Sequence, residues 1–310
     1  MNKIALVSLA TVIIGFSLIH HSIAADFKEA DELFEKGTFQ TALEEYDQIA
    51  KVSKDSQEAF KAFYRGCESL AFLYRYGEAM DRIHNYKGTL SLYDQSRFLA
   101  LKVEMLRNFL MQYGGYQRND VIDVTGKEVF RLTPKEIKKE IAQTYSQLWD
   151  SRQELIKIPL KQEEYFFDLK NVDFGMYPTF LDYVVQSWLG DILQGSHDEK
   201  NMPNPEALPL LADEYQQPLD MNDQPGVMAA ELIEALIRLH GNDQSEARER
   251  WKIMRLALPI QNYSLYSFPK DKFYYDYALM AKDVLLRWAE SFKNPEAKAE
   301  ALYQSAFILN

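Results

Sequence analysis

The sequence FKEADELFEKGTFQTALEEYDQI, residues 27–49, shows the spacing of an amphipathic helix twice, once on each side of Gly37. Apolar side chains recur three or four positions apart, at Phe27, Ala30, Phe34, Phe39, Ala42, Leu43, Tyr46 and Ile49. Such spacing places them on one face of a helix. Glycine adopts the backbone conformations that end helices, so Gly37 marks a turn. We therefore predict a helical hairpin over residues 26–51.

This hairpin resembles a tetratricopeptide repeat. That repeat uses small, large, turn-glycine, aromatic, small and aromatic residues at the spacings of Ala30, Leu33, Gly37, Phe39, Ala42 and Tyr46. The small residues allow the two helices to approach closely. The match is incomplete, because Lys54 stands near the place of the usual closing proline. A second, degenerate repeat follows 37 residues later, with Tyr76 and Ala79 in the places of Phe39 and Ala42.

Helical signals continue through the rest of an N-terminal region, residues 26–194. Thr133, Pro134 and Glu136 form a capping box, which predicts a helix running to about Ile156. Its buried positions are expected to be Ile137, Ile141, Tyr145, Leu148 and Leu155. Residues 121–132 are the one candidate for a short β-hairpin, around Thr125-Gly126. Pro178 is expected to start another helix, with a buried face of Phe180, Val184, Trp188, Leu189 and Ile192.

Residues 195–226 form a polar connector that contains five prolines. Proline and polar residues interrupt regular structure, so this stretch is the strongest candidate for a domain boundary. A loop wrapped on one continuous domain is the alternative, and the sequence favours neither.

Residues 227–310 return to helical hairpins. Ala229, Leu232, Ile233, Leu236 and His240 mark one face of a helix that ends at Gly241. After a three-residue turn capped by Asn242 or Asp243, the next helix continues through Ala247, Trp251, Met254 and Leu258 to Pro259. A last pair is expected at about 274–292 and from Pro295, capped by Asn294, to the end. The predicted fold is all-α, with successive hairpins forming a tetratricopeptide-like α-solenoid.

Composition agrees with a helical globular protein of 310 residues, with 47% hydrophobic and 26% charged residues. The formal net charge of −11 argues against nucleic-acid binding, which needs a concentrated basic surface. The only cysteine, Cys67, excludes an internal disulfide. It falls within an apolar stripe of Phe60, Phe63, Tyr64, Leu70 and Tyr74, so we expect a buried side chain.

Residues 1–25 have the pattern of a secretory signal peptide. Lys3 precedes a run without charge from Ile4 to Ile19, and Ser22-Ile23-Ala24 supplies a cleavage site. An uncleaved anchor is the alternative, but the run is shorter than the roughly 20 residues of a membrane-spanning helix. We expect cleavage before Ala25 or Asp26, export to the periplasm or beyond, and no membrane span in the cleaved product.

Sequence motifs of known catalytic or cofactor sites are absent. Ser267 and Lys270 match S-x-x-K, but Pro269 would disturb the helical turn on which that motif depends. His84, His197 and His240 are not paired at metal-binding spacing, although Asp198-Glu199 follow His197. Glu163-Glu164 have no partner for acid–base chemistry. We therefore predict no catalytic residue, no cofactor and no metal site.

Three stretches resemble the N-terminal helical region of bacterial alpha-2-macroglobulin-like proteins: Tyr165–Trp188, above all residues 173–183 (DFGMYPTFLDY), then Ala247–Trp251 with Arg255-Leu256, and the helix Ala297–Leu309. That family consists of exported protease traps, many with a thioester between a cysteine and a glutamine. Leu70 stands where Cys67 would need that glutamine. The resemblance therefore implies only the leading helical module, a non-catalytic scaffold without bait or thioester.

Three classes of function remain. The first is that scaffold, which would bind further domains of a longer chain. The second is a free-standing tetratricopeptide-like adaptor that binds a protein partner, and an enzyme with an unrecognised site is the third. The final helix lacks a polar outer face along Ala299, Leu302, Tyr303, Ala306 and Leu309. An uncapped solenoid exposes its apolar stripe, so we expect this chain to be the leading part of a longer one.

Overall fold

The computed structural model describes residues 27–113, 132–194, 208–213, 225–241, 245–260 and 272–309. Within these ranges every regular element is a helix, so the all-α prediction is confirmed. An isolated β-bridge joins Pro159 to Thr179. The signal peptide lies outside the described residues, as does the expected β-hairpin apart from Leu132. The solenoid arrangement stays a prediction.

The chain divides into two compact units, residues 1–69 and 70–310. In the first unit α1 (Phe27–Glu35) and α2 (Phe39–Val52) form the expected hairpin, and α3 (Ser56–Phe72) begins. Its core consists of Ala30, Ala42, Tyr46, Ile49 and Ala62. Gly37 has a φ of 76°, and the N–H groups of Gly37 and Thr38 donate to the carbonyls of Phe34 and Leu33. This is the hydrogen-bond pattern of a Schellman turn.

The same turn recurs 37 residues later, between α3 and α4 (Tyr76–His84). Tyr74 has a φ of 60°, and the N–H groups of Tyr74 and Arg75 donate to the carbonyls of Ala71 and Leu70. Tyr74 was expected in the buried stripe of Cys67, which is wrong: its side chain is 59% exposed. The reason is that α3 ends at Phe72, so Tyr74 takes the left-handed turn position. Cys67 itself is buried, as predicted.

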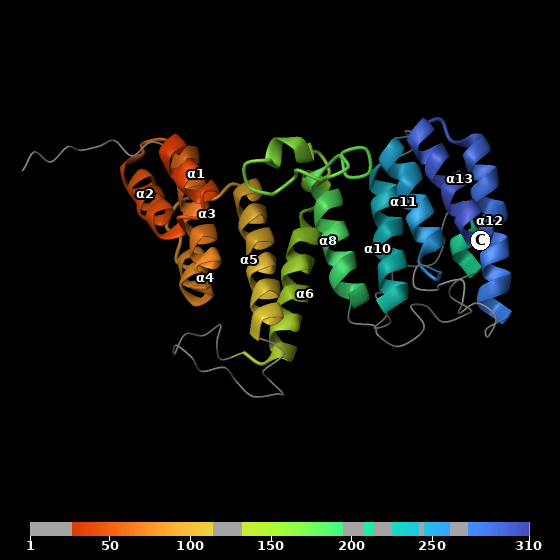
Figure 1. Cartoon of the computed structure of the whole chain (residues 1–310), viewed down its shortest axis with the longest axis horizontal. Coiled ribbons are helices and arrows are strands. Elements are labelled where there is room, and N and C mark those ends of the chain that lie inside the picture. The colour runs from red at the N-terminus through yellow and green to blue at the C-terminus, as the bar shows by residue number, and fades with distance from the viewer. Residues whose placement is uncertain are drawn as a thin grey trace, which may run out of the picture. The chain divides into compact units, whose positions relative to one another are not determined.

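Further helices make up the rest of the second unit, and the longer of them stand side by side in Figure 1. They are α5 (Leu92–Tyr113), α6 (Pro134–Asp150), α7 (Arg152–Leu155), η3 (Leu160–Glu163), α8 (Phe180–Gln194), η4 (Leu208–Leu211), α10 (Pro225–Leu239), α11 (Glu246–Ala257), α12 (Lys272–Ser291) and α13 (Pro295–Leu309).

The capping box at the start of α6 is confirmed by hydrogen bonds between Thr133 and Glu136. The helix stops at Asp150 rather than Ile156, because Ser151 leaves the helical conformation with φ −91° and ψ 9°. The short helix α7 follows, and its Leu155 side chain is buried in the core. All five positions expected to be buried are buried: Ile137, Ile141, Tyr145, Leu148 and Leu155.

The helices on the two sides of the proline-rich connector, α8 and α10, pack against each other. The domain boundary expected there stays a prediction. In α8 four of the five expected core residues are buried, and Ile192 is only half-buried. Leu181, Val185 and the carboxylate of Asp182 join them in the interior.

Two hairpins follow in the C-terminal part of the second unit. α10 ends at Leu239, and the predicted glycine, Gly241, follows in the turn with a φ of 73°. The turn is longer than three residues, because α11 begins at Glu246 and Ser245 caps it; Asn242 and Asp243 lie outside the described residues. Asn294 caps α13 as predicted. α11, α12 and α13 share a core of Ile253, Leu256, Tyr277, Ala281, Val284, Leu285, Trp288, Ala289 and Ala301.

Candidate functional site

The segment 173–182 is the part of the chain in which polar contacts from several helices meet. It begins with a turn in which Asp173 Oδ1 accepts the N–H groups of Gly175 at 3.0 Å and Met176 at 3.3 Å. The ring of Tyr177 then meets Trp251 of α11 edge-on, 5.7 Å between centroids. Burial raises the pKa of Tyr177 to about 12. The segment thus lies against α11 before α8 starts.

Asp182, in the first turn of α8, is fully buried and accepts four hydrogen bonds. Its Oδ2 receives the N–H and hydroxyl of Thr179, at 3.0 and 2.6 Å, and Thr179 Oγ1 accepts the Asp182 N–H at 3.2 Å, which together form a capping box. Its Oδ1 receives Nε1 of Trp251 at 2.9 Å and pairs with Nε2 of His240 at 2.7 Å. One carboxylate therefore joins α8 to the end of α10 and to α11.

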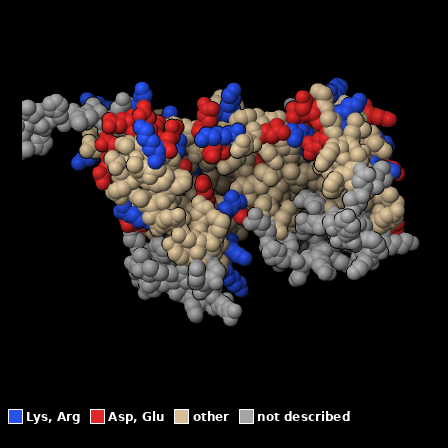
Figure 2. All heavy atoms as spheres, in the orientation of Figure 1, with Lys and Arg blue, Asp and Glu red and all other residues tan. Residues whose placement is uncertain are grey.

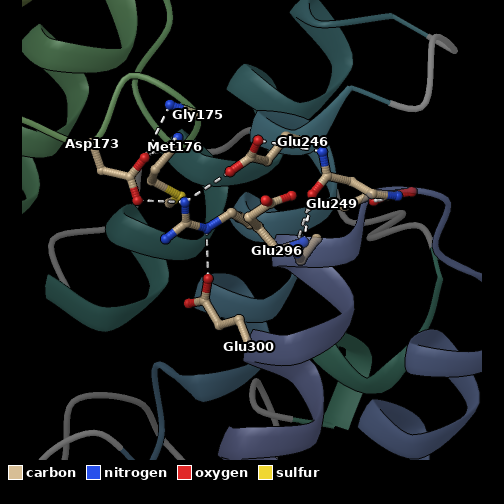
Figure 3. A network of polar contacts seen from close by, with 10 residues as sticks. Asp173, Gly175, Met176, Glu246, Glu249, Glu296 and Glu300 are labelled. Carbon is tan, nitrogen blue, oxygen red and sulfur yellow. Dashed lines mark hydrogen bonds and ion pairs between the residues drawn. The ribbon is translucent and has the colours of Figure 1, made fainter.

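Arg250 of α11 is the centre of a second cluster, drawn in Figure 3. Its Nη1 donates to Asp173 at 2.6 Å and to Glu246 at 3.1 Å, and its Nε donates to Glu300 of α13 at 2.6 Å. Burial alone would lower the pKa of Arg250, but hydrogen bonds to Asp173 and Glu300 raise it. The guanidinium thus links three segments of the chain. Figure 2 shows charged side chains gathered along the edge of the second unit where α8, α11 and α13 begin.

Two glutamates of α11 extend this cluster to the start of α13. Glu246 accepts the side-chain amide of Asn294 at 3.3 Å, and Glu249 accepts the N–H groups of Lys293 and Asn294. Gly175 lies so close that a Cβ there would be 2.1 Å from Oε1 of Glu246. This position therefore requires a glycine while Glu246 keeps its place.

These hydrogen bonds and ion pairs stabilise the packing of the segments that they join. Burial would raise the pKa of Asp173, but the hydrogen bonds from Arg250 and from two backbone N–H groups lower it overall. A carboxylate so held is a weak base. The charged groups of the cluster are ion-paired or hydrogen-bonded to one another, so they hold the segment before α8 against the starts of α11 and α13.

Of the residues considered for chemistry from the sequence, those that the structure describes have separate partners or face solvent. Glu163 is buried in an ion pair with Arg97 at 2.7 Å, while Glu164 is exposed. His84 is exposed, and His240 is engaged with Asp182. His197, Ser267 and Lys270 lie outside the described residues. In the described part of the chain, no group of three or more His, Cys, Asp or Glu side chains is placed to hold a metal ion.

The last hairpin exposes an apolar surface, which we call the α13 face: Ala299, Leu302, Tyr303 and Phe307. Leu302, Tyr303 and Phe307 are 45%, 66% and 54% exposed, and the two rings stack at 6.4 Å. Their spacing of three, four and eight residues from Ala299 forms a stripe opposite the buried Ala297 and Ala301. None of the described helices is both long and apolar enough to cross a membrane.

Sequence patterns indicated the helix ends in this region but not the clusters. Arg250 and Asp182 stood out only as parts of stretches that resemble the alpha-2-macroglobulin-like family, and no sequence pattern marked Glu246. The spacing of Thr179 and Asp182 was the one local signal, because it matches a helix cap.

Comparisons with family models, with curated proteins and with solved structures found no match for this chain.

Proposed function

We propose that this protein is an exported, non-catalytic helical scaffold that uses its last hairpin to bind another protein domain. The observation that carries the proposal is the α13 face. Helix α13 buries Ala297 and Ala301 against its neighbours and presents a second apolar stripe to solvent. Contiguous exposed apolar residues on a helix are typical of interaction surfaces.

The free energy that a partner would gain by covering the α13 face is moderate. Covering a large apolar side chain completely contributes about 1.5–3 kcal/mol. Leu302, Tyr303 and Phe307 are each about half exposed. Covering the remaining surface would contribute roughly 3 kcal/mol in all, which is enough for one part of a larger interface. The occupant we propose is a further helical domain that continues the packing of α11, α12 and α13.

Two features support the scaffold class. The clusters around Asp182 and Arg250 join helices that lie far apart in the sequence. The likeness of segment 173–183 to the leading region of alpha-2-macroglobulin-like proteins agrees with a module that positions other domains. Export rests on residues 1–25 and is tested separately: mass spectrometry of the secreted protein should give Ala25 or Asp26 as the first residue. A free-standing periplasmic adaptor that binds a protein partner is the alternative.

A site-specific crosslinking experiment tests the proposed surface. A photoreactive amino acid at Tyr303 should give one discrete crosslinked product in cells that make the full chain. The matched control is the same amino acid at Asp283, which is 74% exposed on the neighbouring helix α12. Products that are equal at both positions, or absent from Tyr303, would contradict the proposal. Leu302→Glu should remove the Tyr303 product without changing the circular dichroism spectrum.

A further inference from the structure

Three basic residues lie on one face of α11. Arg248, Lys252 and Arg255 are four and three positions apart, so their side chains are neighbours on the helix surface. Like charges in this arrangement repel one another and destabilise a helix. None of the three is freely exposed: Arg255 is fully buried, and Arg248 and Lys252 are partly buried. Each of these charges therefore needs an anion close to it.

Arg255 has a carboxylate of its own. Its Nη1 donates to Glu234 of α10, which is also buried, and its Nη2 donates to the carbonyl of Ala212 at 2.5 Å. Glu234 pairs with Arg238 as well, at 3.3 Å. Because this one carboxylate already serves two arginines, little of its charge is left for Lys252 one turn earlier on α11.

Lys252 has an aromatic neighbour but no ion pair with another described residue. Its Nζ lies over the ring of Trp288 of α12, 6.0 Å from the centroid. The nearby Asp213 accepts Nε1 of Trp288 at 2.7 Å. Glu249, one turn before Lys252, accepts the two N–H groups just before α13 instead. Burial lowers the pKa of Lys252, and the charges of the two arginines on the same face lower it further.

Arg248 has a donor without an acceptor. Its Nε is buried and makes no hydrogen bond within the part of the chain that the structure describes. Arg250, two residues later, by contrast donates to three carboxylates. Buried donors are almost always hydrogen-bonded in folded proteins, so an unused one indicates a place for an acceptor. Arg248 also stands in the first turn of α11, where the helix dipole disfavours a cation and favours an anion.

We propose that Arg248 and Lys252 together bind the phosphate group of inorganic phosphate or of a small phosphomonoester. Two positive charges one turn apart match a dianion, whereas a carboxylate would compensate only one of them. The Nε–H of Arg248 and the ammonium group of Lys252 can both donate to phosphate oxygens, and hydrogen bonds between charged groups are strong. The site uses no residue of the α13 face and does not depend on the function proposed above.

Binding is tested on the full chain labelled with isotope-enriched tryptophan, because Trp288 lies beside Lys252. At pH 7 and constant ionic strength, sodium phosphate should shift the indole N–H signal of Trp288, assigned with Trp288→Phe, with a low-millimolar midpoint. Sodium acetate should act at least about tenfold more weakly. Glycerol 3-phosphate distinguishes the two sources. Tighter binding than that of inorganic phosphate assigns the site to a phosphomonoester, and equal or weaker binding assigns it to inorganic phosphate.

Arg248→Gln and Lys252→Gln should each weaken phosphate binding at least about tenfold. Lys138→Gln, which removes an exposed lysine of α6, is the matched control and should bind as the unmodified chain does. Arg248→Lys keeps the positive charge and should restore part of the binding, which a purely structural role of the arginine would not give. No shift with phosphate, equal action of phosphate and acetate, or unchanged binding by either glutamine variant would overturn the proposal.

Discussion

Replacing Asp182 by alanine tests how far a single buried carboxylate holds α8, α10 and α11 together. The substitution leaves Nε1 of Trp251 and Nε2 of His240 without their acceptor, in a region where Trp251 is fully buried. Each orphaned buried donor costs about 1–3 kcal/mol. Loss of the carboxylate's hydrogen bonds to Thr179 costs about 1 kcal/mol more. We expect the free energy of unfolding to fall by roughly 3–5 kcal/mol.

The assay is urea unfolding of the chain from residue 26, followed by tryptophan fluorescence and circular dichroism. Asp182→Asn keeps the shape but places an amide NH₂ where two donors point, so it should lose at least about 2 kcal/mol. The control Asp168→Ala removes an exposed carboxylate that accepts only the Lys170 N–H at 3.3 Å, and should change stability by less than about 0.5 kcal/mol. A loss below about 1 kcal/mol for Asp182→Ala would refute this account of the cluster.

The remaining predictions concern the turns and the Arg250 cluster. Gly175→Ala should cost at most about 1 kcal/mol, because it displaces only the carboxylate end of the flexible Glu246 side chain from Arg250, and its effect should be less than additive with Glu246→Ala in a double-mutant cycle. Asp173→Asn should lower the urea midpoint slightly at pH 7, since the lowered pKa of Asp173 makes its charge stabilising above about pH 4. That difference should fade as the pH drops through the folded pKa, and a constant difference down to pH 2 would contradict it. Gly37→Ala should lower the free energy of unfolding by about 1–2 kcal/mol. The cause is the left-handed backbone alone, because the nearest atom to the new Cβ is 4.0 Å away. An unfolding temperature equal to that of the unmodified chain, measured by calorimetry, would contradict this prediction.

Helix ends were the features that local sequence predicted best. The box of Thr133 and Glu136, the turns at Gly37 and Gly241, and the cap at Asn294 all depend on residues within five positions of one another. Capping and left-handed turns satisfy backbone groups locally, so the sequence alone carries the information. The same holds for the buried faces, because helical periodicity decides which side chains share a side.

Predictions failed where a turn moved a residue off the face on which periodicity had placed it. Tyr74 kept the spacing of the Cys67 stripe, but α3 ended two residues earlier and left the ring exposed. The helix after Pro134 stopped at Asp150 instead of Ile156, although Leu155 still reached the core. The spacing of apolar residues does not show at which residue a helix ends and a turn begins.

Sequence by itself thus determined that this protein is helical, where several of its helices begin and end, and which faces they bury. Only the tertiary structure decided what the polar residues do. Asp182 meets His240 and Trp251 across 58 and 69 residues, and Arg250 meets Asp173 across 77. Whether such residues pair or face solvent depends on how the helices pack against one another. Local propensity carries no information about that, because the energies involved are set by burial and by distance in space.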